Sequence, residues 1–290
     1  MTRIAHPGQA IALLVAATAC FAALDTTSKF ISASVPLVMA IWTRNVFQVF
    51  VTALVLLPRH GHSLLVTRRP GLQFLRGAML LACSCLAYLS LRHMPVGEFT
   101  AIVMLTPLLI TAIAAFSVGE QVPPMRWVLV LGGFCGALIV IRPGTDSFNW
   151  TLLLPLALVG TSTAFQLLTS RLAAVEDPGT MHFYTGCTGV LLTTLALPFF
   201  WQTPSGLATW ALLLLLGMCS SLGHYLLILA YGRASPATLT PYLYFQIAFA
   251  TLFGWLVFSH APDTWALAGI GVIAVSGVLG TWLHASPARR

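Results

Sequence analysis

Ten apolar stretches, each long enough to cross a bilayer, follow one another along the chain. A helix needs about 20 predominantly apolar residues to cross the hydrocarbon core, whereas strands of a membrane barrel are about half as long. The pattern therefore predicts an all-α integral membrane protein with ten transmembrane helices joined by short connections. The predicted helices cover residues 9–31, 36–57, 71–92, 95–118, 124–141, 151–171, 180–200, 207–230, 236–259 and 263–284.

The composition excludes a soluble globular domain. Hydrophobic residues make up 58% of the 290 residues, and charged residues make up only 7%. Soluble proteins carry about a quarter charged residues, so this chain cannot build a water-facing surface of ordinary composition. Most of its outer surface is expected to face membrane lipid.

The basic residues are distributed unevenly over the connections. If the N-terminus is cytoplasmic, only Lys29, Arg92 and Arg142 fall on the outer side. Cytoplasmic loops are enriched in Lys and Arg, so the count predicts a multi-pass inner-membrane protein with both termini in the cytoplasm. The net charge of +7 then reports this topology, and no nucleic-acid partner is expected. The arginines assigned to the cytoplasmic side are Arg3, Arg59, Arg68, Arg69, Arg76, Arg126, Arg171, Arg233, Arg289 and Arg290.

The cysteines do not form the pattern of a metal site or a disulfide framework. All six lie within predicted helices, where free cysteine packs as a small apolar residue. No metal and no cofactor are therefore expected. The six are Cys20, Cys83, Cys85, Cys135, Cys187 and Cys219.

The second half of the chain resembles the first half at an offset of about 140 residues. Ser28–Lys29 corresponds to Ser170–Arg171, Trp42 corresponds to Tyr184, and LSLRHMPVGEFT corresponds to ILAYGRASPATLT. Each unit, 1–143 and 144–290, contains five predicted helices. Because five is odd, the two units must insert with opposite orientations. Inverted repeats of this kind are typical of secondary transporters.

Two segments carry a resemblance to a known family. RWVLVLGGFCGALIVIRPG in the first unit, and TPYLYFQIAFATLFGWLVF followed by HAPDTW in the second, resemble EamA-type units of the drug/metabolite transporter superfamily. The resemblance covers essentially the whole chain. It implies ten helices, cytoplasmic termini, a central cavity lined by both halves, and transport of a small organic solute along an ion or solute gradient. The family's acidic residue at the mouth of the fifth helix is Glu120 in the first unit, but His260 stands there in the second.

Three charged residues lie in or beside the first two predicted helices. Asp25 and Lys29 are four residues apart, so they share a helix face and can pair. Lys29 can also extend its ammonium group to the membrane–water interface. Asp25 is either the partner that anchors Lys29 or a residue of the cavity. Arg44 lies eight residues after Pro36, about 12 Å along a helix. At that depth it must face protein or a watery cavity, so it either binds solute, ties the helices together, or does both.

Several uncharged polar and aromatic residues complete the expected substrate site. Trp42, beside Arg44, can stack on a planar solute or pack toward lipid. Pro241 predicts an irregular helix at membrane depth, which is tolerated where the helix lines a cavity. The second-half candidates for the substrate site are Gln166, His224, Tyr244 and Gln246.

Coupling or gating is assigned to the remaining ionisable residues near helix ends. Glu98 lies at the start of the fourth predicted helix, and Glu120 at the edge of the fifth. Either carboxylate can bind a proton, the candidate coupling ion, or serve as a solvated group at a helix end. Lys29 is the third candidate.

A secondary transporter is the leading functional prediction. An intramembrane hydrolase using Ser162 and His224 is the alternative, although neither a GxSxG nor an HExxH motif is present. Inverted repeats are not needed for hydrolysis, so the chain is not expected to be an enzyme. The sequence leaves open the identity of the solute, the direction of transport, and whether the protein is a monomer or a homodimer.

Overall fold

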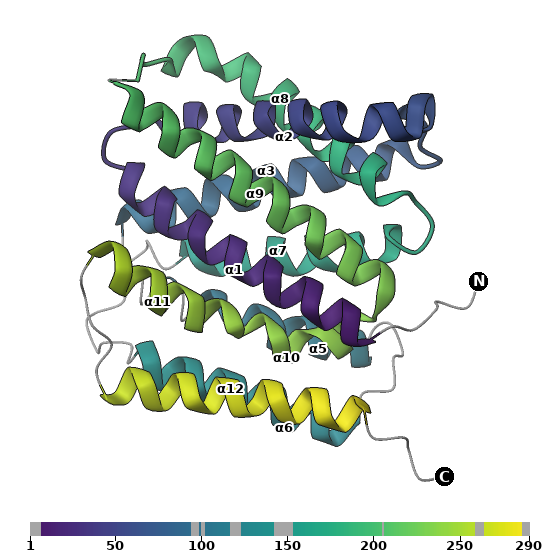
Figure 1. Cartoon of the computed structure of the whole chain (residues 1–290), viewed down its shortest axis with the longest axis vertical. Coiled ribbons are helices and arrows are strands. Elements are labelled where there is room, and N and C mark those ends of the chain that lie inside the picture. The colour runs from purple at the N-terminus through teal and green to yellow at the C-terminus, as the bar shows by residue number, and fades with distance from the viewer. Residues whose placement is uncertain are drawn as a thin grey trace.

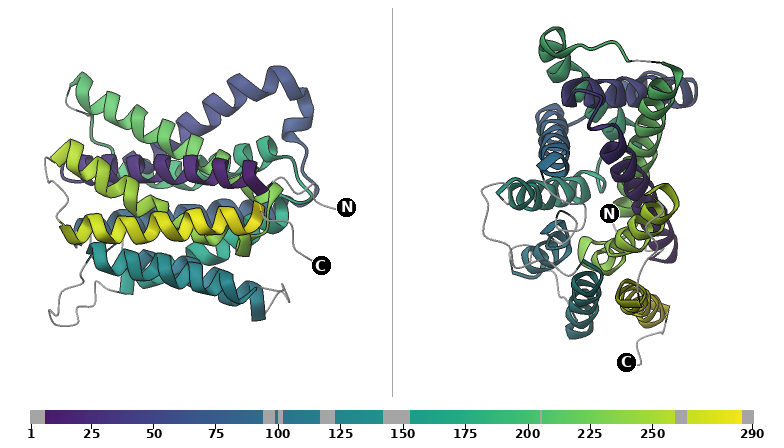
Figure 2. Two further views of the ribbon diagram at one scale, coloured as in Figure 1. Left: turned by 60° about the horizontal axis from the view of Figure 1, so that its bottom comes forward. Right: turned by 90° about the vertical axis from the view of Figure 1, so that its left-hand side faces the viewer.

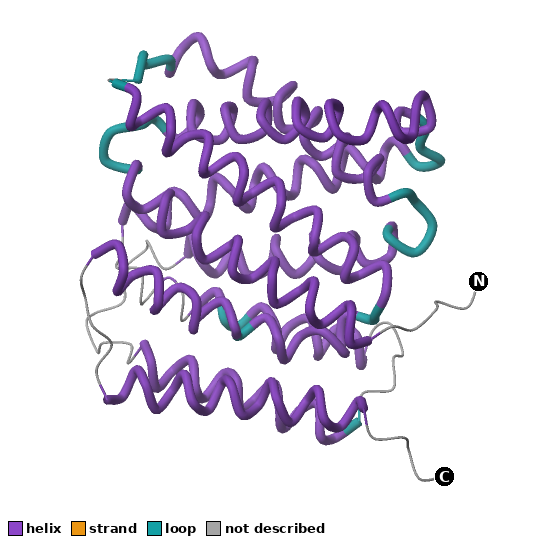
Figure 3. Tube along the Cα trace, in the orientation of Figure 1, coloured by secondary structure: helices purple, strands orange, loops and turns teal. Residues whose placement is uncertain are grey.

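The computed structural model describes residues 7–93, 99, 102–116, 123–141, 153–204, 206–258 and 264–285, and nearly all of them are helical. Figure 3 shows long helices joined by short loops. The elements are α1 (Pro7–Ile31), α2 (Leu37–His60), η1 (Gly61–Leu65), α3 (Pro70–His93), α5 (Thr106–Phe116), α6 (Pro124–Ile141), α7 (Leu153–Leu172), α8 (Pro178–Phe200), α9 (Leu207–Arg233), α10 (Pro236–Leu243), α11 (Phe245–Phe258) and α12 (Thr264–Ala285).

The prediction of an all-helical, ten-helix membrane protein is confirmed. Each of the ten predicted stretches contains a described helix, with α10 and α11 together filling the ninth. Within the described residues, seven helical segments are long and apolar enough to cross a membrane, and α6 and α12 contain shorter apolar runs. The chain is therefore a multi-pass membrane protein.

Proline and one aspartate set several of the helix starts. Pro70, Pro178 and Pro236 are each the first residue of a helix, where the fixed φ fits and no backbone donor is lost. Asp177 caps α8 by accepting hydrogen bonds from the backbone N–H groups of Gly179 (2.8 Å) and Thr180 (3.1 Å). These local signals explain why the helix starts could be read from the sequence.

The helices of the two halves pair in a pattern that is unchanged when the halves are exchanged. α1 packs against α9 as α7 packs against α3, and α2 packs against α9 as α8 packs against α3. Three pairs map onto themselves, namely α2 with α8, α5 with α10, and α6 with α12. α1 begins and α12 ends at the same end of the bundle, on the right of Figure 1. We call this end the N-terminal end.

The bundle has two outer edges and a central group of helices. α2 and α8 form one edge and α6 and α12 the other, in Figure 1 and in both views of Figure 2. Large apolar side chains such as Phe50, Leu195 and Phe199 are exposed on these outer helices. Apolar surface of this extent fits contact with lipid.

Glycines bring α6 and α12 into close contact. A Cβ on Gly136 would lie 2.8 Å from the carbonyl oxygen of Gly269 and 2.9 Å from Cγ1 of Ile273. The first contact is with backbone, which cannot rotate away. Small residues allow membrane helices to approach in this way, so the glycine-rich stretches have a structural role.

Substituting Gly136→Leu should force α6 and α12 apart and lower the free energy of unfolding by about 2 kcal/mol, as overpacking typically does. Thermal unfolding in detergent measures the loss. Gly271→Leu is the matched control, because a Cβ at Gly271 meets no atom within 4 Å. Equal melting temperatures for the two variants would contradict the close packing.

Two segments are interrupted at membrane depth. The helix that contains Pro241 breaks at Tyr244, between α10 and α11, and the chain ahead of α5 turns at Met104 and Leu105. The irregularity predicted for the segment around Pro241 is present, but the break lies three residues after Pro241, whereas proline disrupts the turn that precedes it. Pro107 does come just after the turn at Met104 and Leu105. α5 and α10 contact each other.

Candidate functional site

A cavity lies between the two halves of the protein. It consists of two adjoining volumes of about 160 and about 140 Å³ that share lining residues on α1, α3, α7 and α9. The larger volume is also lined from α5, α10 and α11, and the smaller one from α2. We call the two volumes together the central cavity. The shared lining residues include Leu24, Asp25, Leu80, Cys83, Leu158 and His224.

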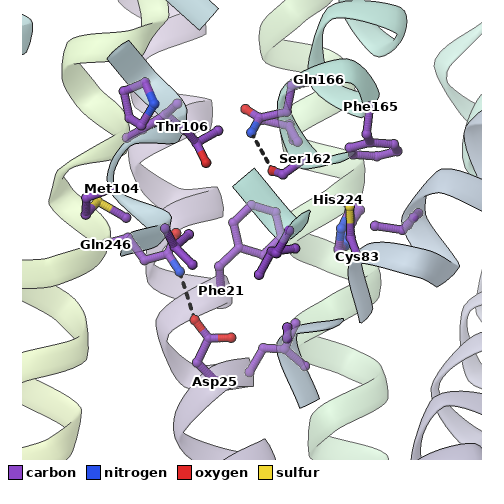
Figure 4. A pocket seen from close by; sticks show the side chains of 18 of the residues that line it. Phe21, Asp25, Cys83, Met104, Thr106, Ser162, Phe165, Gln166, His224 and Gln246 are labelled. Atoms are coloured by element: carbon purple, nitrogen blue, oxygen red, sulfur yellow. Dashed lines mark hydrogen bonds between the residues drawn. The ribbon is translucent and has the colours of Figure 1, made fainter. Parts of the chain in front are cut away.

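Asp25 and Gln246 form a hydrogen bond across the central cavity. Nε2 of Gln246 donates to Oδ2 of Asp25 at 2.8 Å, as Figure 4 shows. Asp25 belongs to α1 and Gln246 to the first turn of α11, just after the break at Tyr244. The bond therefore joins the first half to an interrupted helix of the second half.

Arg44 lines the smaller volume and has an open hydrogen-bonding position. Its side chain is 7% exposed, and Nη2 donates to Oγ of Ser84. Nε is buried and has no hydrogen-bond partner. Asp25 lines the same volume, but it is bonded to Gln246. An acidic and a basic side chain thus face one cavity, each with a neutral hydrogen-bond partner.

The second half contributes His224 between two aromatic rings. Nδ1 of His224 lies 2.8 Å from the carbonyl oxygen of Ser220, so we assign the proton to Nδ1, which leaves Nε2 as an acceptor. The ring centroid lies 4.9 Å from that of Phe21 and 6.1 Å from that of Phe165, both edge-to-face. These rings supply apolar faces beside a polar group.

Polar groups on α7 and α5 line another part of the central cavity. Gln166 donates from Nε2 to Oγ of Ser162 at 3.1 Å and accepts from the hydroxyl of Tyr231 at 2.8 Å. Thr106 also lines the cavity, and its hydroxyl is buried without a hydrogen-bond partner. Figure 4 shows these groups on the opposite side of the cavity from Asp25. The cavity can therefore meet a polar organic molecule with both donors and acceptors.

Five of the predicted substrate residues come together in this cavity. They are Asp25, Arg44, Gln166, His224 and Gln246. The prediction missed Ser84, Phe21 and Phe165, and it named Ser162 only for the hydrolase alternative, because small hydroxyl and aromatic residues are common throughout membrane helices and carry no specific signal. The helical spacing of Ser162 and Gln166 was the one hint available.

Trp42 and Tyr244 lie outside the cavity lining, contrary to expectation. Trp42 donates from Nε1 to Oγ1 of Thr194 at 2.9 Å and contacts Trp201 edge-to-face. It is two residues from Arg44, which places it about 200° around α2. Tyr244 is fully buried, and its hydroxyl donates to the carbonyl oxygen of Met104 at 3.4 Å. It joins the two helix breaks.

The coupling candidates are separated from the cavity or lie outside the described residues. Nζ of Lys29 donates to the carbonyl oxygen of Leu91 at 3.2 Å. The Asp25–Lys29 pair that the spacing allows is replaced by separate partners for each side chain. Glu98, Glu120 and His260 lie outside the described residues.

Arg76 requires a correction. Its place six residues into α3 suggested a cytoplasmic loop charge, but the side chain is fully buried inside the bundle. Counting charges near helix ends cannot distinguish a side chain that points to the headgroups from one that points inward. Leu80 and Cys83, four and seven residues later, line the cavity, so helical spacing did place Arg76 on the cavity face.

Known proteins resemble the chain in sequence and in fold. Residues 8–142 match the EamA-like transporter family. A riboflavin transporter of Rhizobium johnstonii is 33% identical over 77% of this chain and 74% of its own length. An S-adenosylmethionine uptake transporter of Rickettsia felis is 28% identical over 78% of each chain. A crystal structure with 19% identity has a TM-score of 0.73 and covers 92% of this chain and 96% of its own.

These relatives are named as transporters, as is a pseudopaline exporter of Pseudomonas aeruginosa that is 26% identical over 91% of this chain and 93% of its own length. The family and its named members are not enzymes, which removes the support for a hydrolase using Ser162 and His224. The chain carries small metabolites and belongs to the EamA-like transporter family.

Proposed function

We propose that this protein is a secondary transporter that moves a small organic metabolite across the cytoplasmic membrane by alternating access, with the central cavity as its substrate site. The observation that carries the proposal is a cavity with charged residues in its lining that lies between two halves of the chain. The main helix contacts of one half have counterparts when the corresponding helices of the two halves are swapped. Two such halves can open the cavity to either side at similar energy.

The proposed repeats are residues 1–143 and 144–290, inserted with opposite orientations. The exchange symmetry of the helix contacts supports this division. The placement of the first and last described helix ends at one end of the bundle fits termini on one side of the membrane, which we assign to the cytoplasm from the charge distribution. The energy for transport comes from the gradient of the solute itself or from a proton gradient.

The lining of the cavity favours a planar, polar metabolite. Phe21 and Phe165 offer apolar faces, Asp25 and Nε2 of His224 offer acceptors, and Arg44 offers donors. Two of the relatives are named for riboflavin and S-adenosylmethionine, and both compounds combine a planar heterocycle with hydrogen-bonding groups. We propose a solute of this chemical class.

Uptake into proteoliposomes tests the function. Radiolabelled riboflavin and S-adenosylmethionine are offered separately to vesicles that contain the purified protein, with and without a pH gradient. We expect protein-dependent accumulation of at least one solute in unaltered form, and no accumulation in empty vesicles. Chemical conversion of the solute, or equal accumulation in empty vesicles for both solutes, would contradict the proposal.

A further inference from the structure

Arg76 is a buried charge that the substrate site does not use. Its Nε donates to Oγ1 of Thr169 at 2.9 Å, and Nη1 donates to the carbonyl oxygen of Met181 at 2.9 Å and to Oγ1 of Thr185. The side chain is 0% exposed. Each of these acceptors is neutral and belongs to the second half, on α7 or α8, whereas Arg76 belongs to α3 in the first half.

The guanidinium lies just beyond the central cavity, toward the N-terminal end. Leu80, one turn after Arg76 on α3, lines both cavity volumes. Thr169, which accepts from Arg76, is one turn after Phe165 on α7, and α7 runs toward the N-terminal end. The guanidinium carbon lies 5.2 Å from the centroid of the Phe165 ring, and that ring lines the cavity.

A further hydrogen bond joins the two halves on the N-terminal side of the cavity, because Gln48 follows the cavity residue Arg44 by one turn on α2 and α2 runs toward that end. Nε2 of Gln48 on α2 donates to the carbonyl oxygen of His182 on α8 at 2.9 Å. Nε2 of His182 lies 3.0 Å from Oγ of Ser221. The Gln48 and Arg76 contacts together form a polar layer between the cavity and the N-terminal end. Since the Gln48 and Arg76 bonds connect the two halves, this end cannot open without breaking them.

A charge with neutral partners is suited to a contact that must form and break. A buried guanidinium loses its hydration, and neutral acceptors return only part of that free energy. When the end opens, water rehydrates Arg76 and offsets the lost hydrogen bonds. The hydrogen bonds of the polar layer are therefore stable while the layer excludes water, and they can break once water enters.

We propose that Arg76 is the positioning residue that holds the central cavity closed at the N-terminal end and releases when that end opens to pass solute. The inference rests on alternating access. The guanidinium keeps α3 against α7 and α8, and it does not contact the solute in the closed state.

The second half does not carry an equivalent charge. The repeat pairs Arg92 with Arg233, and the same offset pairs Arg76 with Gly217. A Cβ on Gly217 would lie 2.9 Å from the Phe47 side chain, so that position is filled by packing. Loss of Arg76 should therefore open one end of the cavity selectively.

Cys83 is a native reporter for this opening, because it lines both cavity volumes and is buried. The experiment uses the full chain with the other cysteines replaced by serine, in membrane vesicles of both orientations. A charged, membrane-impermeant methanethiosulfonate labels Cys83 from one side at a time. Labelling of Arg92→Cys and Arg233→Cys, each in a cysteine-free chain, identifies the two faces.

In the parent, we expect slow labelling of Cys83 from the face that Arg233→Cys identifies, since α9 ends at the N-terminal end (Figure 1). Arg76→Met should raise that rate by about 10-fold or more, the population shift expected when hydrogen bonds to a charge are lost. Arg76→Lys, which can still donate to the same acceptors, should restore most of the slow rate. Arg171→Met is the matched control, because Arg171 is exposed near the same end of α7.

An unchanged rate in folded Arg76→Met would overturn the proposal. If that variant does not fold, the double variant Thr169→Val and Thr185→Val removes two acceptors and keeps the charge. It should raise the rate several-fold from the same face only, and equal rates would again overturn the proposal. Solute uptake by the parent is measured separately. An unchanged labelling rate contradicts the role of Arg76, whereas absence of uptake by the parent contradicts the proposed transport function.

Discussion

Replacing Arg44 by glutamine should lower solute uptake by about 10- to 100-fold, the loss expected when a hydrogen bond to a charged group is removed. The side chain is buried at the cavity wall, and its Nε has no partner within the protein. Because Arg44 lines the smaller volume, its guanidinium and fixed charge are placed to meet the solute. Initial uptake rates in proteoliposomes, normalised to inserted protein, measure the effect.

Trp42→Phe is the matched control for Arg44. It lies two residues away on the same helix, but its indole donates to Thr194 at the α2–α8 contact. We expect near-normal uptake from Trp42→Phe and partial uptake from Arg44→Lys, which keeps the charge and loses the forked donor geometry. Uptake reduced equally by Trp42→Phe and Arg44→Gln would show that α2 acts through packing alone.

The Asp25–Gln246 bond should give the second large effect. Asp25→Ala and Gln246→Ala should each lower uptake about 10-fold or more, because each variant leaves a cavity-facing partner without its hydrogen bond. The double variant should be much less impaired than the product of the two single effects, since both remove one shared interaction. Initial uptake rates for the four proteins form a double-mutant cycle.

Additive effects in that cycle would mean that Asp25 and Gln246 act on the solute independently. Thr251→Ala provides a control on α11, because its hydroxyl donates to the carbonyl oxygen of Ile247 in its own helix. This variant should carry solute normally. A loss of uptake in Thr251→Ala comparable to that in Gln246→Ala would point to a general weakening of α11.

The membrane itself explains why the helices could be predicted so closely. Every spanning segment must satisfy its own backbone and present about 20 apolar residues, and prolines mark the joints. An irregular helix near Pro241 was expected, although the break lies after the proline, at Tyr244. The contact of Tyr244 with Met104 was not expected, because it joins residues from opposite halves.

The prediction succeeded for residues whose depth in the membrane alone forces them to face the interior. It failed for residues whose direction depends on how the helix is rotated about its axis. Asp25 and Arg44 are costly in lipid at any rotation, so they had to face the interior. Trp42 is stable on either face of α2, and the contact with α8 selected its direction. Arg76 was counted among the charges on or near the cytoplasmic side because it lies near a helix start, and only the surrounding α7 and α8 show that it points inward.

The helix pairs that map onto themselves under exchange of the halves divide the molecule into two kinds of position. Under the proposed alternating access, α6 and α12 keep each other as partners whichever side is open, so Gly136→Leu should destabilise both states alike and leave their ratio unchanged. Under the same proposal, α3 exchanges environments with α9 between the two states, so a change at Arg76 should alter the ratio of the states. Separate substitutions should therefore change the stability of the protein and the side of the membrane to which its cavity opens.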